Sequence, residues 1–127
     1  VESVADFSEL QALDQGVSGG LAVVAWGSTY GAVYQAVNDA LAAGYDVAHV
    51  HLRHLNPLPS NLGELLAGFK TVLVPELNSG QLATLLRDRL LVQVEQLNKV
   101  TGQPLTVGEV IHAIERLASR RMREVSQ

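Results

Sequence analysis

The part of the sequence best suited to hold an anion is a short turn bounded by glycines. Gly27-Ser28-Thr29-Tyr30-Gly31 lies between an apolar run and an amphipathic segment, where a strand passes into a helix. Backbone N–H groups and two hydroxyls at such a position can bind an anion, helped by the helix dipole. The turn has no lysine and no G-x-x-x-x-G-K pattern, so it is not a Walker loop. Capping of the helix by Ser28 or Thr29 is the simpler interpretation.

Three histidines form an H-x-H-x-x-H pattern at positions 49, 51 and 54. Residues two apart on a strand face the same way, so His49 and His51 could share a metal ion. No carboxylate lies among them, Arg53 is adjacent, and their strand should be buried. A metal site needs a third ligand and a supporting shell of hydrogen bonds. The pattern therefore favours packed or hydrogen-bonded histidines, and we expect no metal site.

Charged and polar residues also follow the second and third strands. Arg53 could bind a carboxylate or phosphate in bidentate fashion, tie down its own loop, or pair with Glu76. Glu76 and Asn78 lie before the helix that Gly80 opens, and a carboxylate at a strand end is a candidate acid or base. No second carboxylate, nucleophile or base stands at a recognisable spacing from Glu76. We therefore expect no catalytic residue in this chain.

The elements that position these residues alternate regularly between strand and helix. Gly44 is placed to end the first helix in a left-handed conformation, Asn61 to cap the second, and Thr106 with Glu109 to form a capping box on the last. The predicted strands are 21–26, 46–52, 71–74 and 91–97, and the predicted helices contain the apolar stripes of 33–41, 61–69, 82–86 and 107–118.

This alternation predicts an α/β fold with a parallel sheet between helix layers. Such sheets bind ligands beyond the carboxyl ends of their strands. If the second and third strands both flank the first, Arg53 and Glu76 lie on either side of the Ser28-Thr29 turn. Residues 1–20 are expected to be an N-terminal extension or linker, and residues 21–127 one domain.

Composition excludes several classes of protein. The 127 residues are 47% hydrophobic and 17% charged, which is too apolar for a disordered chain. The net charge of −4 argues against nucleic-acid binding, which needs a basic face. Without cysteine, the chain holds no thiolate-ligated cluster, disulfide or catalytic thiol. No signal peptide or membrane span is visible, so we expect a cytoplasmic location without membrane contact. The start at Val1 rather than Met suggests a piece of a longer polypeptide.

Residues 26–31, followed by a helix and Ala43-Gly44-Tyr45-Asp46-Val47, resemble the phosphate loop and first helix of a flavodoxin. This resemblance covers only about 25 residues and implies a flavin-binding redox module. The flavodoxin pattern has a further threonine where this chain has Ala32 and Val33. It also has aromatic residues that sandwich the flavin, and none occurs in the later strand-end loops.

A second resemblance extends over roughly residues 20–115. It is carried by VAWGSTYGAVYQAV, HVHLRHLNPLP, VLVPELNSGQLATLLR and the segment from Asn98-Lys99 to Thr106. In this order and spacing the blocks resemble the C-terminal, transketolase-C-like domain of the alpha subunit of 2-oxoacid:ferredoxin oxidoreductases, especially the 2-oxoglutarate type. The resemblance implies a three-layer α/β/α fold with a mostly parallel sheet of four or five strands. The fifth, antiparallel strand would lie near residues 1–5 or 15–20.

The same resemblance implies a role in assembly rather than catalysis. The holoenzyme of that family converts a 2-oxoacid to acyl-CoA, and we expect its thiamine diphosphate, magnesium and iron–sulfur cluster to be bound elsewhere. The expected partners are the remaining domain of the alpha subunit and the beta subunit, with a homodimer as a further possibility for the isolated chain. Aliphatic residues on strand-end loops are the expected interface: Leu55, Pro57, Leu58 and Leu77.

Overall fold

A strand of consecutive apolar residues lies at the centre of the sheet. In the computed structural model, which describes residues 11–53, 59–77, 81–90, 93–99 and 105–118, β2 (Leu21–Trp26) pairs with a strand on each side. The sheet order is β1-β3-β2-β4-β5. β2, β3, β4 and β5 are parallel, and β1 pairs with β3 in the antiparallel direction. The other strands are β1 (Gln15–Gly16), β3 (Val47–Leu52), β4 (Thr71–Leu77) and β5 (Glu95–Lys99).

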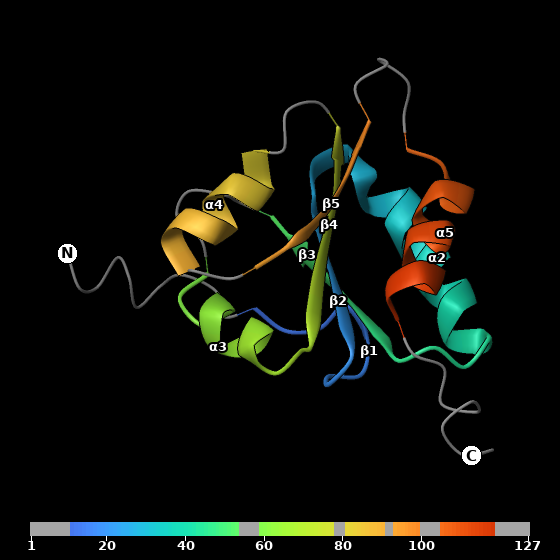
Figure 1. Ribbon diagram of the computed structural model, residues 1–127, viewed down its shortest axis with the longest axis horizontal. Helices are drawn as coiled ribbons and strands as arrows, with labels where there is room; N and C mark the ends of the chain where they lie inside the picture. Colours follow the sequence, from blue (N-terminus) through green and yellow to red (C-terminus); the bar gives the residue numbers. More distant parts are fainter. Residues whose placement is uncertain (1–10, 54–58, 78–80, 91–92, 100–104, 119–127) are drawn as a thin grey trace.

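Helices cover both faces of this sheet (Figure 1). α2 (Tyr30–Ala42) and α5 (Val107–Leu117) lie on one face, and α3 (Leu62–Ala67) and α4 (Gln81–Leu90) lie on the other. A 3₁₀ turn, η1 (Gly27–Thr29), joins β2 to α2. The three-layer α/β/α fold with a mostly parallel sheet is therefore confirmed. None of the helices in the described ranges is long and apolar enough to cross a membrane.

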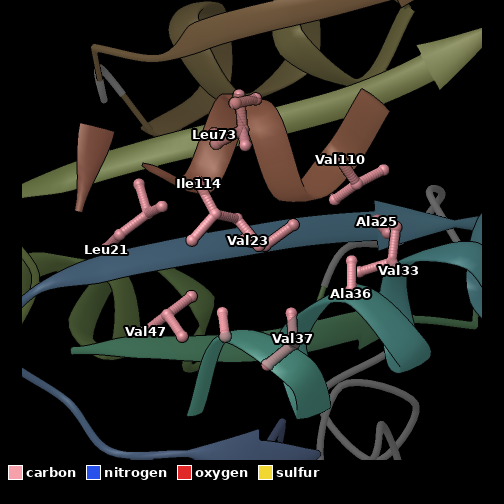
Figure 2. Packing of buried hydrophobic residues seen from close by; sticks show 12 residues of the cluster. Leu21, Val23, Ala25, Val33, Ala36, Val37, Val47, Leu73, Val110 and Ile114 are labelled. Atoms are coloured by element: carbon pink, nitrogen blue, oxygen red, sulfur yellow. The ribbon is translucent and has the colours of Figure 1, made fainter. Parts of the chain in front are cut away.

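The side chains of β2 alternate between two hydrophobic clusters because successive residues of a strand point to opposite faces. Leu21, Val23 and Ala25 join the cluster beneath α2 and α5, part of which Figure 2 shows. Ala22 and Val24 join the cluster beneath α3 and α4. All five are at most 1% exposed. Burial on both faces explains why this strand is a continuous apolar run.

Two of the three predicted helix-end residues have the predicted role. Gly44 has φ +94° just after α2, and Thr106 forms a capping box with Glu109 at the start of α5. The expectation that Asn61 caps the second helix is wrong. No side-chain cap bond is present at α3, and the Asn61 amide instead pairs with the backbone N–H and C=O of Gln11, both at 2.7 Å. The Asn61 side chain thus bonds to Gln11, fifty residues away, instead of to the first turn of α3.

β4 and β5 differ most from their expected ranges, while β3 begins one residue later than expected. β4 continues through Pro75 and Glu76 to Leu77, whereas a loop was expected from residue 75. Past Leu73, β4 no longer pairs with β2 and pairs with β5 alone. Pro75 therefore lies where β4 has a neighbour on one side only, and this position tolerates a residue that has no backbone N–H to donate. β5 begins at Glu95 rather than at residue 91, because α4 continues to Leu90 and the pairing with β4 starts at Leu73 opposite Glu95.

The antiparallel edge strand lies in the second of its two expected places. Gln15 pairs with His49 and Gly16 with Ala48. Gly16 has φ +87°, and a Cβ atom there would lie 2.1 Å from the carbonyl oxygen of Val47. A glycine is therefore required where this strand meets β3. The alternative location at residues 1–5 lies outside the described part of the chain.

Candidate functional site

The carboxyl ends of three adjacent strands meet at one edge of the sheet. Trp26, the last residue of β2, lies opposite Leu52 of β3, so Arg53 follows directly beside the η1 turn. On the other side, the Nε1 of Trp26 donates a hydrogen bond to Glu76 of β4. Arg53 and Glu76 therefore flank the turn from either side, as the sequence predicts. Their proposed role in binding a ligand or partner stays a prediction.

The turn at residues 27–31 is held by its own backbone and one hydroxyl. Gly27 has φ +69°, and the Oγ1 of Thr29 donates to the carbonyl oxygen of Trp26 at 2.9 Å. No side-chain bond caps the start of α2, so capping by Thr29 is wrong: its hydroxyl closes the 3₁₀ turn instead. Gly31 lies in the first turn of α2 and is exposed. The turn thus keeps the backbone N–H groups that could hold an anion, but the Thr29 hydroxyl is already engaged.

Glu76 is 2% exposed and is held by three donors. Its Oε1 accepts from the Trp26 indole at 3.3 Å and from the backbone N–H of Leu82 at 2.9 Å, and its Oε2 accepts from the N–H of Ala83 at 3.0 Å. Leu82 and Ala83 belong to the first turn of α4, where N–H groups have no partner within the helix. Among the donors described for Glu76 there is no guanidinium, so the pairing of Glu76 with Arg53 is not observed. Glu76 acts as the cap of α4.

This arrangement leaves Glu76 poorly suited to acid–base chemistry or to phosphate binding. Its carboxylate oxygens are committed to structural donors, and its negative charge occupies the helix N-terminus where a phosphate would otherwise bind. The donor set therefore does not fit the diphosphate of a thiamine cofactor at this helix. Among the described residues, no group of three histidine, aspartate or glutamate side chains could hold a metal ion.

The two strand histidines lie on the face of the sheet opposite Glu76. His49 and His51 face α2, where their rings contact Tyr30 with centroid separations of 5.5 Å and 4.7 Å. The Nδ1 of His49 lies 2.8 Å from the Oε1 of Gln15. The histidines are thus packed and hydrogen-bonded, as the sequence favours. The same-face spacing of His49 and His51 was the available signal, but nothing in the sequence indicates Gln15 as the partner.

Burial governs the charge of both histidines. Desolvation lowers the pKa of His49 from 6.5 to about 4, against an opposing attraction from Asp14 and with a smaller lowering by His51. Desolvation also lowers the pKa of His51, again opposed by Asp14 and assisted by Arg53. Both rings are therefore neutral near pH 7.

Several residues expected at the site lie outside the described residues. They are Asn78 and Gly80 of the candidate anion loops, and Leu55, Pro57 and Leu58 of the expected interface. Leu77 is the last residue of β4, and Ser28 lies in η1, but the structure does not describe their side chains. The interface expectation therefore stays a prediction.

Most of the chain matches a known protein family. Residues 20–121 match the family described as pyruvate:ferredoxin oxidoreductase core domain II. The chain is 43% identical over 107 residues to the 2-oxoglutarate oxidoreductase subunit KorA of Mycobacterium tuberculosis, a match that covers 84% of this chain and 16% of that subunit.

Solved structures agree with the family match. The fold is similar to that of the 2-oxoglutarate:ferredoxin oxidoreductase of Magnetococcus marinus, which was solved with 2-oxoglutarate, coenzyme A and succinyl-CoA, with a TM-score of 0.82 and 28% identity. That match covers 91% of this chain and 21% of the other. A split-gene transketolase, solved as an inactive beta4 tetramer, shares the fold with a TM-score of 0.63 and 20% identity, over 80% of this chain and 39% of its own.

Proposed function

Because the chain belongs to the pyruvate:ferredoxin oxidoreductase core domain II family, we propose that it is a non-catalytic assembly domain of a 2-oxoglutarate:ferredoxin oxidoreductase subunit. The observation that carries the proposal is the 43% identity, over 84% of the chain, to a 2-oxoglutarate oxidoreductase subunit. The chain spans only 16% of that subunit. Substrate binding and electron transfer are therefore assigned to the remaining domains and to partner subunits.

The chemistry of the strand-end edge supports a role in assembly. Its buried carboxylate, Glu76, caps α4 and fixes Trp26, so it is not free to exchange a proton with a substrate. Thiamine diphosphate, where the complete enzyme binds it, supplies the carbanion stabilisation that decarboxylation of a 2-oxoacid requires. In this proposal the chain contributes a rigid surface that packs against the domains holding that cofactor, its magnesium and the iron–sulfur cluster.

Two measurements test the proposal. The purified chain, mixed with 2-oxoglutarate, coenzyme A and oxidised viologen, should give no viologen reduction. The tagged chain, produced together with the remaining alpha-subunit domains and the beta subunit, should co-purify with them and support reduction of viologen. Turnover by the chain alone would contradict the non-catalytic role, and failure to co-purify would contradict the assembly role.

The expected interface gives the association test a matched control. Leu58→Asp and Leu77→Asp should weaken co-purification if these leucines face the partner domains, because each would place a charge in an apolar contact. His112→Asp on the exposed side of α5 introduces the same carboxylate away from that edge and should leave co-purification unchanged.

We do not propose flavin binding for this chain. The 27–31 turn lies within residues 20–121, which match the pyruvate:ferredoxin oxidoreductase core domain II family.

A further inference from the structure

Residues 11–17, here called the strap, run along the outer edge of β3. The N–H of Asp14 donates to the carbonyl oxygen of His49 at 2.7 Å, and the N–H of Val17 donates to that of Val47 at 3.4 Å. Only Gln15 and Gly16 pair as a regular strand. The strap therefore covers the edge at which β3 would otherwise present unpaired backbone groups.

Side chains extend this cover beyond the two paired residues. The N–H of His51 donates to the Oδ1 of Asp14 at 2.8 Å, and the Nε2 of Gln11 donates to the carbonyl oxygen of His51 at 3.2 Å. Leu13 packs against the cluster beneath α3 and α4, whereas Val17 is 41% exposed. The strap is thus held mainly by polar contacts, of which those from Gln11 to Asn61 and His51 are part-buried. Segments with few buried apolar contacts open at a lower free energy than the core.

The hydrogen bonds beneath the strap fix which nitrogen of His49 carries the proton. The Nε2 of Gln15 donates to the carbonyl oxygen of Tyr34 at 3.2 Å, so its Oε1 faces His49 as an acceptor. The Nδ1 of His49 must therefore be the donor in that contact, and its Nε2 carries the lone pair. His49 is 0% exposed, and its Nε2 has no hydrogen-bond partner among the described residues. The buried Nδ1 of His51 has none either.

A second proton on His49 would have no acceptor in this arrangement. The added N–H at Nε2 would be buried, and the ring centroid of His51 lies only 5.9 Å away. The other groups that face the two rings are the Asp14 carboxylate on the strap, Arg53 after β3, and the phenol rings of Tyr30 and Tyr34 on α2. Asp14 favours the charged rings, but burial outweighs it at both of them.

We propose that the strap and the His49–His51 pair form a proton-operated latch: protonation of the imidazoles releases residues 11–17 from the β3 edge while the rest of the sheet stays folded. Release gives the imidazolium N–H groups access to water. It also uncovers the N–H and C=O of His51 on the β3 edge, where a strand from another chain could pair. The latch is independent of the assembly role proposed above.

The pH range of release follows from the histidines. With the strap closed, burial holds the pKa of His49 at about 4, and in the released, hydrated state it returns toward 6.5. A group with a lowered pKa in the closed state stabilises that state above pH 6.5 and loses this contribution as the pH falls toward 4. His49 alone then lowers the closed-to-open ratio by about 80-fold between pH 6.5 and pH 4.

Amide hydrogen exchange of the 127-residue chain, corrected for intrinsic rates, tests the latch. The N–H groups of Val17 and His51 should lose protection progressively between pH 6.5 and pH 4, while those of Val23 and Val24 in β2 stay protected. Constant protection of the strap over this range would overturn the proposal. Loss of protection in β2 in parallel with the strap would also overturn it, because the event would then be global unfolding.

A second test opens the strap without changing any charge. In Gly16→Ala the new Cβ would meet the carbonyl oxygen of Val47 at 2.1 Å, so the strap should detach at pH 7. The pKa of His49, measured by NMR titration, should then rise toward 6.5. Gly108→Ala in α5, where a Cβ meets nothing within 4 Å, should leave that pKa unchanged. A His49 pKa that stays near 4 in Gly16→Ala would show that the strap does not bury the ring and would overturn the latch.

Discussion

The indole of Trp26 donates to the carboxylate of Glu76 at 3.3 Å, across fifty residues of sequence. The same carboxylate caps α4, so one buried charge ties together the end of β2, the end of β4 and the start of a helix. Trp26 and Glu76 both face the α3 and α4 layer, and this contact makes the strand-end edge a fixed surface.

Removing this carboxylate should destabilise the chain and loosen Trp26. Glu76→Ala leaves two backbone N–H groups and an indole N–H without their acceptor, which should lower the free energy of unfolding by roughly 1.5–3 kcal/mol. Glu76→Gln keeps one acceptor oxygen and should cost less. Urea unfolding measures the loss, and emission from the single tryptophan should shift to longer wavelength as Trp26 becomes hydrated. Glu115→Ala, at an exposed position of α5, is the control. Equal stability of the Glu76 and Glu115 variants would contradict the capping role.

The capping box of α5 gives a second prediction. Thr106→Ala removes the hydroxyl that accepts from the N–H of Glu109 at 3.1 Å, and should lower the free energy of unfolding by about 1 kcal/mol. Thr106→Ser retains the oxygen and should restore most of the stability. Thermal unfolding followed by circular dichroism compares the two. A serine variant as unstable as the alanine variant would point to the lost methyl group instead of the cap.

Two glycines should respond oppositely to alanine. A Cβ at Gly20 would lie 2.5 Å from the carbonyl oxygen of Asp46, a backbone atom that cannot move without shifting β3, so Gly20→Ala should cost roughly 1–3 kcal/mol. Gly108 lies within α5 with nothing within 4 Å of a Cβ, so Gly108→Ala should stabilise the chain by up to about 1 kcal/mol. Chemical unfolding of both variants checks the pair, and a loss of stability at Gly108 would be the unexpected result.

The buried histidine should make global stability depend on pH. The pKa of His49 is about 4 in the folded chain and near 6.5 when unfolded, so unfolding takes up a proton between these values. Stability should therefore fall as the pH drops from 6.5 toward 4. His49→Leu should flatten this dependence, even though it loses the bond to Gln15 and is less stable at pH 7. His112→Leu, at an exposed position, should keep the wild-type slope. Urea unfolding at several pH values compares them, and identical slopes in wild type and His49→Leu would argue against the assignment.

The sequence predicts those features that depend on local pattern. The apolar run of β2, the left-handed Gly44 and the capping box at Thr106 are all where their residues place them, because each is determined within a few positions. Asn61 fails as a cap because its partner, Gln11, is fifty residues away, and no local pattern encodes that competition.

In the candidate site, too, some features are predictable from the sequence and others are not. The strand-end positions of Arg53 and Glu76 follow from strand order and are predictable. The partners of Glu76 are not, because they depend on how β4 extends past Pro75 and on where α4 begins. Similarly, the spacing of His49 and His51 indicates a shared face, but their burial depends on a two-residue strand that no periodicity could indicate.

The strand order also has a consequence for how the chain folds. β2, α2 and β3 form one continuous βαβ unit between residues 21 and 52, so its contacts close a short loop. The pairing of β2 with β4 joins residues fifty positions apart, Leu21 with Thr71, and costs more loop-closure entropy. β4, α4 and β5 form a second βαβ unit of similar span, in which Leu73 pairs with Glu95. We therefore expect the two βαβ units to form first and the β2–β4 pairing that joins them at the centre of the sheet to form last.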